Sequence, residues 1–366
     1  MRILHLYKDY YPVLGGIENY IKVLAEAHAA QGHQVTVLVC APGPRSEVKE
    51  LHGVRIYRAA RLATAASMPL SLQQPLRLAR LQADVIHLHA PYPLGEVSAW
   101  LLKRRTPWVM TYHSDIVRQK GWLKLYAPLL RRVLRRVDRI LVTSPRYLET
   151  SQWLRPVRDR CLVSPLGVDH QRFHPPATPY EGPPRLLFVG RLRYYKGLDT
   201  LLQALLLLPG DVTLEVVGSG PMLAEWQALA GRLGVASRVH FRGEISDDAL
   251  LGVYRHVTLF VLPANARAEA FGMVLLEAMA SGLPCVTTEI GTGTSWIVQD
   301  GVTGFVVPPD QPEALARAIR RLLTDAALRQ RMGRAARERV EAEFTQRAMV
   351  DRVLTVYREV ASGDSE

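Results

Sequence analysis

The feature that most constrains this chain is a regular alternation of short apolar segments with longer amphipathic segments, which stops once and then starts again. Short runs rich in β-branched residues predict buried strands, and the segments between them have the apolar spacing of helices. Strands that alternate with helices predict βαβ units and parallel sheets. The interruption is the segment 173–184, which holds five prolines, a density that helices and central strands do not tolerate.

Most of the predicted strands are followed by a predicted helix. The strands are Arg2–Tyr7, Gln34–Cys40, Val54–Arg58, Asp84–His89, Trp108–Tyr112, Arg139–Thr143, Arg185–Val189, Thr213–Val217, Val239–Phe241, Leu259–Leu262, Cys285–Thr287 and Gly304–Val307. The helices are Ile17–Gln31, Leu94–Lys103, Leu123–Val137, Gly197–Leu208, Met222–Leu233, Asp247–Tyr254, Phe271–Ala280 and Glu313–Leu323, with a helical stretch Ala326–Val360 at the end. This order predicts an α/β protein with two doubly wound domains.

We place a first domain at residues 1–172, a linker at 173–184, a second domain at 185–345 and a terminal helix at 346–366. Open parallel sheets bind ligands beyond the carboxyl ends of their strands. Two such sheets that face each other enclose a cleft, which is a common place for a ligand. We therefore expect the motifs at strand ends to carry the chemistry.

The positive charge of the chain is concentrated in its first half. Residues 1–182 contain 26 Lys and Arg against 13 Asp and Glu, whereas residues 183–366 contain 20 against 21. This asymmetry predicts an anionic partner for the first half, such as a membrane surface or a phosphorylated acceptor. The alternative is an arginine-rich surface without such a partner. Nucleic acid is not expected, because none of its recognised binding motifs is present.

The cysteines and the apolar runs indicate a cytoplasmic protein. Cys40, Cys161 and Cys285 are odd in number and widely spaced, so we expect a reducing compartment rather than a disulfide framework. Cys40 and Cys285 lie in or beside apolar predicted strands, so we expect these two thiols to be free and buried. The opening apolar run is too short for a signal peptide. The longest later run, Leu198–Pro209, contains polar residues and is too short to span a bilayer.

Two common nucleotide-binding motifs are not found. The fingerprint G-x-G-x-x-G does not follow the first strand, and the G-S-G segment at 218–220 has Leu223 in place of the third glycine. The G-T-G segment at 291–293 has Trp296 there, and G-x-x-x-x-G-K-[ST] is absent. A nicotinamide enzyme and a P-loop NTPase are therefore both disfavoured.

Glycine-rich loops follow the first strand of each predicted domain. Gly15 and Gly16 precede the first helix, where exposed backbone N–H groups and the helix dipole suit a phosphate, although a plain strand–helix turn fits equally well. In the second domain Arg191 and Lys196 flank the corresponding loop. A forked guanidinium and a compact ammonium together match a diphosphate. The alternative is a pair of surface charges.

Glu269 and Glu277 form the motif E-x7-E beside the predicted helix Phe271–Ala280. On an ideal helix, this spacing places the two carboxylates about 80° apart and ~12 Å along the axis. One carboxylate then reaches a sugar while the other reaches a ribose, because carboxylates accept two hydrogen bonds from vicinal hydroxyls. Gly272 lets a ligand approach the backbone. The alternative is a helix-capping acid and a solvated helix residue.

Three histidines lie on or after predicted strands of the first domain. His113 follows Trp108–Tyr112, where an imidazole bonds a sugar hydroxyl or a developing charge, although a lone histidine is more often structural. His87 and His89 share one strand face. They resemble a metal pair, but nothing completes a site at recognisable spacing, so we expect no metal.

The segment Arg118–Arg139 is strongly basic and contains interleaved aromatic and aliphatic residues. A basic amphipathic helix of this kind predicts binding to an anionic membrane surface. We therefore expect a peripheral association with the inner face of the cell membrane. The alternative is a solvated helix on one face of the domain.

Taken together, these motifs resemble retaining GT-B glycosyltransferases of family 4. The resemblance rests on G-R-x4-K-G at 190–197, Glu269-x7-Glu277, G-L-P-C at 282–285 and G-V-T-G-F-V-V-P at 301–308, and it spans nearly the whole chain. It implies two Rossmann-like domains that face a cleft, with a terminal helix crossing back to the first domain. It also implies metal-independent transfer of a hexose with retention of configuration, and no cofactor besides the nucleotide-sugar substrate.

The resemblance also implies roles for individual residues. Arg191 and Lys196 would hold the diphosphate, approached by Gly16 from the other domain. Glu277 would bind the ribose, and the loop containing Ile245 would border the base. Glu269, with backbone groups near Phe271 and Gly272, would hold the hexose, and His113 would meet the sugar. Gly218, at the end of a predicted strand, is included with the donor-binding residues.

The donor and the acceptor are less closely defined by these residues. The segments 190–197 and 291–296 resemble those of bacterial mannosyl- and rhamnosyltransferases that build surface polysaccharides, which favours GDP-mannose. A UDP-sugar is the alternative donor. The acceptor is expected to be a glycan, a lipid-linked sugar or a phosphosugar. A nucleotide-sugar epimerase and a non-catalytic sugar-binding relative are the rival functions.

Overall fold

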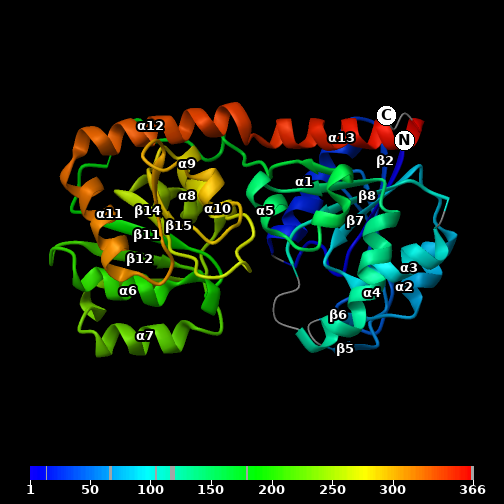
Figure 1. The fold of residues 1–366 in the computed structure, drawn as a ribbon, viewed down its shortest axis with the longest axis horizontal. Coiled ribbons are helices and arrows are strands. Elements are labelled where there is room, and N and C mark those ends of the chain that lie inside the picture. Colours follow the sequence, from blue (N-terminus) through cyan, green and yellow to red (C-terminus); the bar gives the residue numbers. More distant parts are fainter. Residues whose placement is uncertain (14, 66–67, 104, 116–119, 179, 364–366) are drawn as a thin grey trace. The chain divides into compact units, whose positions relative to one another are not determined.

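The computed structural model describes residues 1–13, 15–65, 68–103, 105–115, 120–178 and 180–363. The chain divides into two compact units, each with its own core (Figure 1). The first unit contains residues 1–165 together with 347–366, and the second contains residues 166–346. Among the described residues no helix is both long enough and apolar enough to cross a membrane.

The first unit is built on an eight-stranded sheet. In sheet order its strands are β10 (Cys161–Val163), β9 (Arg139–Val142), β8 (Trp108–Tyr112), β7 (Val85–Ala90), β1 (Arg2–Leu6), β2 (Gln34–Cys40), β4 (Val54–Ala59) and β3 (Glu47–Leu51). Neighbouring strands pair in parallel, except that β3 is antiparallel to β4. Successive strands move outward from β1 in one direction and from β7 in the other. The switch point of the sheet therefore lies between β1 and β7.

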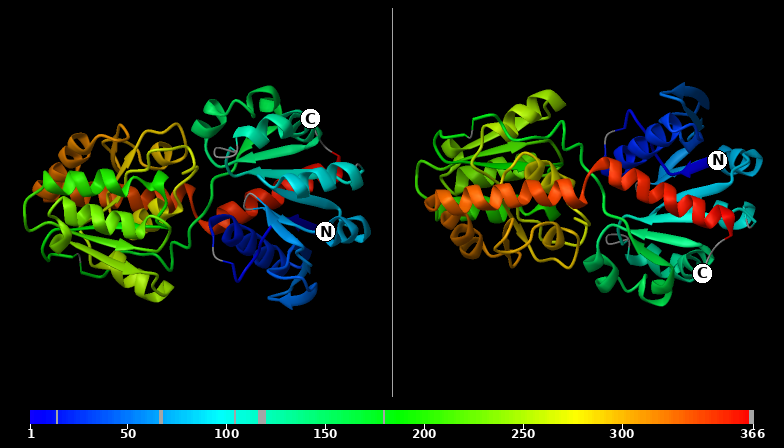
Figure 2. Two further views of the ribbon diagram at one scale, coloured as in Figure 1. Left: turned by 90° about the horizontal axis from the view of Figure 1, so that it is seen from below. Right: turned by 90° about the horizontal axis from the view of Figure 1, so that it is seen from above.

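The helices of the first unit include one from the far end of the chain. They are α1 (Gly16–Ala30), α2 (Gln73–Arg80), α3 (Pro93–Leu102), α4 (Lys120–Arg136), α5 (Pro145–Thr150), the 3₁₀ helix η1 (Arg155–Arg160) and α13 (Gln346–Ser362), and a small hairpin is formed by β5 (Ala63–Ala65) and β6 (Met68–Leu70). The last helix lies along the first unit (Figure 2). His28 on α1 donates through Nε2 to the carbonyl of Val350, at 3.2 Å. His87 on β7 meets the hydroxyl of Tyr357 at 2.5 Å.

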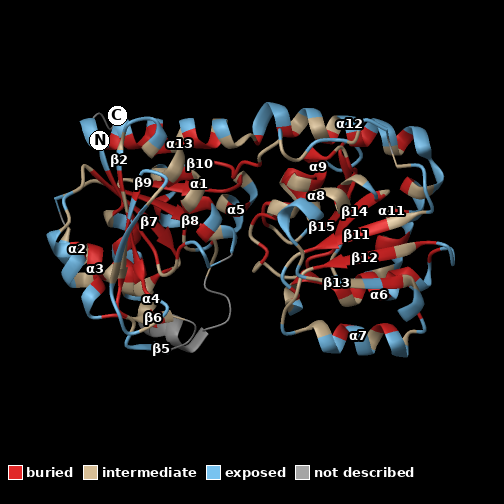
Figure 3. Cartoon of the chain, turned by 180° about the vertical axis from the view of Figure 1, so that it is seen from behind, coloured by how far each residue is buried: buried red, intermediate tan, exposed pale blue. Residues whose placement is uncertain are grey.

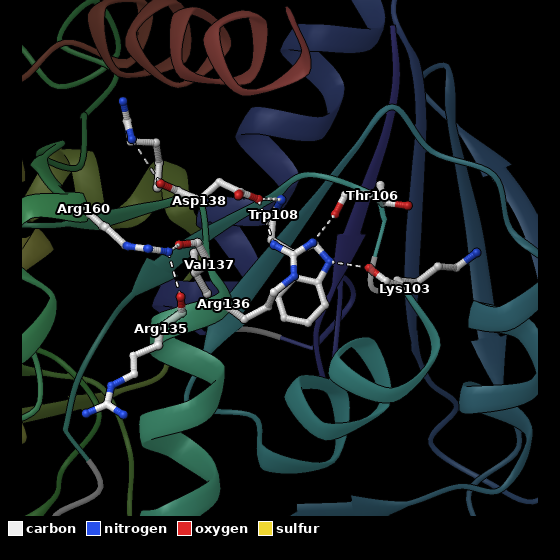
Figure 4. Close-up of polar contacts among 9 residues, drawn as sticks. Lys103, Thr106, Trp108, Arg135, Arg136, Val137, Asp138 and Arg160 are labelled. Carbon is white, nitrogen blue, oxygen red and sulfur yellow. Dashed lines mark hydrogen bonds and ion pairs between the residues drawn. The ribbon is translucent and has the colours of Figure 1, made fainter. Parts of the chain in front are cut away.

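The C-terminal end of α4 is fastened to the sheet by polar contacts (Figure 4). Arg160 donates to the carbonyls of Arg135 and Val137, at 2.7 and 3.1 Å. A cation at this end of a helix satisfies unpaired carbonyls and interacts well with the helix dipole. Asp138 accepts from the backbone N–H of Trp108 at 2.7 Å and pairs with Arg136. This end of α4 is thereby fixed to β8 and β9.

The second unit contains a six-stranded sheet in which all pairs are parallel. Its strands, in sheet order, are β13 (Val239–Gly243), β12 (Thr213–Val217), β11 (Arg185–Val189), β14 (Leu259–Leu262), β15 (Cys285–Thr288) and β16 (Gly304–Val307). Its helices are η2 (Tyr194–Lys196), α6 (Leu198–Leu206), α7 (Leu223–Arg232), η3 (Ala236–Arg238), α8 (Asp247–Arg255), α9 (Met273–Ala280), α10 (Thr294–Ile297), α11 (Pro312–Thr324) and α12 (Ala326–Glu343). Right-handed crossovers put α6 and α7 on one side of the strands and α8 and α9 on the other, as Figure 1 shows.

Burial follows the pattern expected of parallel sheets. The strands β7, β14 and β15 are buried at every position, whereas the outward faces of the helices are exposed (Figure 3). Helices that cover both faces of a parallel sheet produce this continuous apolar pattern. The expected free, buried thiols of Cys40 and Cys285 are confirmed.

The predicted strands are all present, with ends that differ by at most two residues. The sequence analysis missed β3, β10, α2, α5, α10, the short 3₁₀ helices and the β5–β6 hairpin. β3 has the charged sequence E-V-K-E-L and lies at the sheet edge, where solvent exposure removes the apolar pattern that marks a buried strand. The predicted stretch Ala326–Val360 is two helices, α12 and α13.

The proline-rich segment 173–184 differs from the expected linker, because the units divide between Pro165 and Leu166. Arg337 on α12 explains part of this difference. Its Nη1 donates to the carbonyls of His170, Phe173 and Ala280, each at 2.7 Å. These hydrogen bonds fasten the start of the segment to α12 within the second unit.

Gly197 is expected to be indispensable for the stability of the second unit. Its backbone has φ of 67°, and a Cβ atom there would lie 2.0 Å from the carbonyl oxygen of Pro263. Gly197→Ala adds left-handed strain of ~1–2 kcal/mol to this collision, so we expect a loss of more than about 2 kcal/mol of unfolding free energy. Gly231 on α7 has open space around it, so Gly231→Ala should instead stabilise by about 0.5 kcal/mol. Urea unfolding of both variants checks this, and similar midpoints would contradict it.

Candidate functional site

Lys196 and Glu269 form a buried ion pair at the ends of two neighbouring strands. Lys196 ends the turn η2 that follows β11, and Glu269 lies in the loop that follows β14. The Nζ atom of Lys196 lies 2.7 Å from Oε2 of Glu269, and each residue is only 8% exposed. Because β11 and β14 are adjacent and the strand order reverses between them, the pair lies at the switch point of this sheet.

The two loops that carry the pair are also joined through their backbones. The N–H of Asn265 donates to the carbonyl of Tyr195 at 3.0 Å. A Cβ atom at Gly190 would lie 3.2 Å from Nζ of Lys196. The absence of a side chain at Gly190 therefore leaves room for the ammonium group. The geometry of the ion pair therefore depends on the close approach of the β11 and β14 loops.

Burial makes this ion pair costly for the fold. Removing each charge from water costs several kcal/mol, and the attraction between the charges recovers this only when their geometry is good. The pair nevertheless lies at the carboxyl ends of the strands, which is the edge of an open parallel sheet where ligands generally bind. Pairs of this kind are candidates for functional groups on physical grounds.

Glu277 lies on α9 and is half-buried. Burial raises the pKa of its carboxyl to about 7, and the hydroxyl of Tyr254, which donates to Oε2 at 2.9 Å, opposes the rise. The positive charge of Lys196 also acts on Glu277 and lowers its pKa. Glu269, Lys196 and Glu277 therefore belong to one electrostatic group.

The expected helical geometry of the E-x7-E motif is wrong. We expected the helix to begin at Phe271, but α9 begins at Met273, and Glu269 and Phe271 precede it. Gly272 caps the helix with φ of 92°, a conformation that glycine adopts without strain. The spacing of about 80° and ~12 Å applies to a continuous helix and does not describe these two carboxylates.

The other expected donor-binding residues of the second unit lie at three neighbouring strand ends. Arg191 follows β11 and its side chain is exposed. Gly218 follows β12, and a Cβ atom there would lie 2.2 Å from the carbonyl oxygen of Gly190, so the two strand ends touch. Ile245 is partly buried in the loop after β13. Among the predicted site residues that the structure describes, Lys196 and Glu269 are the two that a hydrogen bond or ion pair joins directly.

In the first unit, His113 follows β8 and lies under the first turns of α1. It is 7% exposed, and burial lowers its pKa to about 3, so the imidazole is neutral. The ring of Tyr20 on α1 meets it edge-on, with centroids 5.2 Å apart. Gly16 begins α1 and precedes Tyr20 by four residues, so the two occupy the same helix face. Gly16 and His113 therefore belong to one region, at the carboxyl ends of the strands.

Glu18 holds its carboxylate over the N-terminus of α1. A Cβ atom at Gly15 would lie 2.1 Å from Oε2 of Glu18. Burial raises the pKa of Glu18, while a hydrogen bond from its own backbone N–H opposes the rise. A negative group at a helix N-terminus is stabilised by the unpaired N–H groups and by the helix dipole. The negative group at this helix N-terminus is thus Glu18 of the same chain, and the phosphate role of the glycine loop stays a prediction.

Sequence reasoning missed Tyr254, Tyr20 and His5. Tyr254 lies on α8 and reaches Glu277 across the unit, and Tyr20 reaches the hydroxyl of Thr111 at 3.1 Å. His5 on β1 is in register with His87 on β7. Period-two alternation places His5 on one face of its strand, but only the strand order shows which residue lies beside it.

Two models of known protein families match this chain. The family model described as Glycosyltransferase Family 4 matches residues 14–172, and the model described as Glycosyl transferases group 1 matches residues 169–339. The chain belongs to the family 4 glycosyltransferases. The division between the two matches falls close to the division between the two compact units.

Two curated relatives cover nearly the whole of this glycosyltransferase. D-rhamnosyltransferase WbpZ of Pseudomonas aeruginosa PAO1 is 40% identical over 355 residues, which is 94% of this chain and 92% of the relative. O-antigen chain mannosyltransferase C of Escherichia coli is 36% identical over 366 residues, which is 98% of both chains. Both relatives are named as enzymes that transfer a sugar, and the chain is a glycosyltransferase.

Solved structures of other glycosyltransferases share this architecture. Sucrose-phosphate synthase from Thermosynechococcus elongatus matches with a TM-score of 0.82 and 25% identity over 99% of both chains. WaaG, described as a glycosyltransferase of lipopolysaccharide biosynthesis, matches with a TM-score of 0.71 over 97% of this chain and 99% of its own, at 21% identity. The expected GT-B fold with two Rossmann-like domains is thereby confirmed.

Glu277 should make the stability of the glycosyltransferase depend on pH. Its pKa is about 7 in the folded chain and 4.5 ordinarily, so protonation favours the folded state. This contribution is fully present below pH 4.5 and is lost as the pH rises through 7. Relative to Glu277→Gln, the wild type should lose up to about 3 kcal/mol between pH 4.5 and 8. Denaturant unfolding across this range measures the difference, and parallel curves would show that the carboxyl titrates normally.

Proposed function

We propose that this glycosyltransferase moves a hexose of manno configuration from GDP-mannose, or from its 6-deoxy counterpart GDP-rhamnose, to a glycan or lipid-linked acceptor in surface polysaccharide synthesis. The observation that carries the proposal is the buried Lys196–Glu269 pair at the switch point of the second unit, with Glu277 in the same electrostatic group. The named relatives, a D-rhamnosyltransferase and an O-antigen chain mannosyltransferase, support the sugar and the pathway class.

The charges of the site divide naturally between the parts of a nucleotide-sugar. Lys196 and Arg191 supply positive charge for the diphosphate. The ammonium of Lys196 has three donors, so it can keep Glu269 as a partner while it binds a phosphate oxygen. Glu269 accepts hydrogen bonds from hydroxyls of the hexose, and Glu277 accepts them from the ribose. Gly218, Ile245, Phe271 and Gly272 complete the donor site through backbone and apolar contacts.

The chemical step that we propose retains the configuration at the anomeric carbon. The bond from C1 to the diphosphate oxygen breaks, and the acceptor oxygen bonds to C1 on the same face. The acceptor proton goes to the departing phosphate oxygen. Positive charge that is already in place stabilises the leaving diphosphate without reorganisation. Lys196 and Arg191 supply that charge, so we expect no metal to be needed.

A UDP-sugar is the second candidate donor. Among proteins of this fold, the HepE protein of Anabaena was solved with UDP-glucose bound, at 18% identity and a TM-score of 0.76 over 98% of this chain and all of its own. Incubation with GDP-mannose, GDP-rhamnose and UDP-glucose, each with a lipid-linked acceptor, separates the donors by the sugar transferred. Product analysis also separates transfer from epimerisation, which needs no acceptor, and from binding without turnover.

Loss of the ion pair should stop transfer. Glu269→Ala removes the acceptor of the hexose hydroxyls and should abolish turnover. Lys196→Ala should weaken donor binding by about 1.5–3 kcal/mol, the range for hydrogen bonds to charged groups. Glu225→Ala changes an exposed glutamate on α7 and is the matched control.

Radiolabelled transfer and calorimetric titration of the donor measure both effects. Each single variant leaves a buried partner unpaired, so the thermal midpoint is recorded as well. A folded Glu269→Ala variant with wild-type turnover would remove Glu269 from the site.

We also propose a peripheral association with the anionic inner face of the cell membrane. Of the basic segment Arg118–Arg139, Arg118 lies outside the described residues, whereas Arg131, Arg132 and Arg135 are exposed on α4. Exposed cations near an anionic bilayer contribute ~1 kcal/mol each, and salt screens them.

Replacement of these three arginines by serine should reduce binding to phosphatidylglycerol vesicles at low salt. Arg155 and Arg158 of the same unit are exposed but do not lie on α4, so their replacement by serine is the control. Flotation assays measure the bound fraction. Equal binding of the wild type to neutral phosphatidylcholine vesicles would contradict the proposal.

A further inference from the structure

Three imidazoles form a continuous chain through the first unit, from its core to His113. Nδ1 of His5 lies 3.1 Å from Nε2 of His89, and Nδ1 of His89 lies 3.3 Å from Nε2 of His113. His5 and His89 are 0% and 1% exposed, so His113 is the member nearest to solvent. The rings of His5 and His113 both stack on that of His89, with centroids 5.4 and 5.5 Å apart.

The three rings come from the strands that surround the switch point of the sheet. His5 lies on β1, His89 on β7, and His113 directly follows β8. These strands are neighbours in the sheet. The chain therefore connects the centre of the sheet with its carboxyl edge, where a ligand is expected.

Each ring of the chain is neutral. Burial lowers the pKa of His5 and of His113 to about 3, and burial together with the neighbouring imidazoles lowers that of His89 well below its ordinary value. A neutral imidazole donates through one nitrogen and accepts through the other. If one ring of a hydrogen-bonded chain changes tautomer, its neighbours must change as well. The three rings consequently have only two concerted arrangements.

The nitrogen of His5 that has no hydrogen-bond partner decides between these two arrangements. Nε2 of His5 is buried and has no hydrogen-bond partner among the described residues. A buried N–H without a partner is rarer in proteins than a buried acceptor without one. Nε2 of His5 is therefore assigned as the bare acceptor, so its Nδ1 carries the proton and donates to His89. His89 in turn donates through Nδ1 to Nε2 of His113.

We propose that His5 and His89 are positioning residues that hold His113 as the tautomer with its proton on Nδ1. In this tautomer Nε2 of His113 accepts from His89, and Nδ1–H remains as a donor for a hydroxyl of the bound hexose. The role toward the sugar rests on the proposed function, whereas the tautomer does not. His113 then acts as a donor and not as a base. This is consistent with transfer of the acceptor proton to the departing phosphate.

His87 lies close to the three imidazoles but makes its own hydrogen bonds to other residues. Its Nδ1 meets the hydroxyl of Tyr357 at 2.5 Å, and its Nε2 meets the hydroxyl of Thr111 at 2.7 Å. Ligand atoms of His5, His87 and His89 lie within 4.8 Å of one another, a spacing that also suits a metal ion. Metal binding would have to break the bonds of His87 and the bond between His5 and His89. These existing bonds favour the hydrogen-bonded chain.

Nitrogen-15 NMR of the full chain, labelled at histidine, tests the tautomer directly. Long-range correlations between ring protons and nitrogens distinguish a protonated Nδ1 from a protonated Nε2. The signals of His113 are assigned by their loss in His113→Gln. We expect His113 in the wild type to be protonated at Nδ1, without any substrate present. Protonation at Nε2 would overturn the proposal.

Variants of His5 and His89 then test the coupling. His5→Phe removes the donor to His89, so we expect His113 to lose its single tautomer. His5→Asn places an amide donor where Nδ1 was and should restore that tautomer. His89→Phe should act like His5→Phe. His87→Phe is the matched control, buried on the same strand as His89, and should leave the tautomer of His113 unchanged.

The kinetic readout connects the tautomer to the sugar. His5→Phe should lower kcat/KM for the donor by about two- to tenfold, as expected from one neutral hydrogen bond, and His5→Asn should recover most of it. An unchanged tautomer in both Phe variants would overturn the coupling, as would binding of added zinc to the wild type with shifts of the His5 and His89 signals. If the tautomer is as expected but no donor yields transfer, the proposed function fails and the positioning role stands.

Discussion

The arrangement of the loops after β11 and β14 in the second unit depends on the buried ion pair between Lys196 and Glu269. Two charges at 8% exposure are costly, and the structure holds them by closing the β11 and β14 loops on each other. The glycines at 190, 197 and 218 provide the space for this approach. The fold thus keeps a cation and a carboxylate in fixed positions at the strand ends, and charges fixed in this way are the condition for electrostatic stabilisation in a site.

Both units place their distinctive polar groups at the switch point of a parallel sheet. In the second unit these groups follow β11 and β14, and in the first they follow or lie on β1, β7 and β8. Chain connections leave this edge in opposite directions, which opens room at the strand ends. In each unit, room for a ligand is therefore expected at this edge of the sheet.

The sequence was sufficient for the buried central strands, but not for the exposed edge strand β3 or for the geometry of the E-x7-E motif. Apolar runs such as Leu259–Leu262 need no tertiary information, because every residue of that strand is buried. The start of α9 was misplaced because the φ of 92° at Gly272 depends on contacts with the rest of the unit. His5 and His89 are 84 residues apart, so their contact follows from strand order alone. Tyr254 was missed for the same reason.

The two units solve the problem of buried polar groups in opposite ways. The second unit keeps real charges and pairs Lys196 with Glu269 at the strand ends. The first unit keeps the imidazoles of His5, His89 and His113 neutral by burial and satisfies them with one another. Protonation of His113 would put a charge into this buried cluster, where burial disfavours it. A neutral imidazole keeps an N–H donor without that cost, whereas the buried carboxylate of Glu269 offsets the same cost by pairing with Lys196.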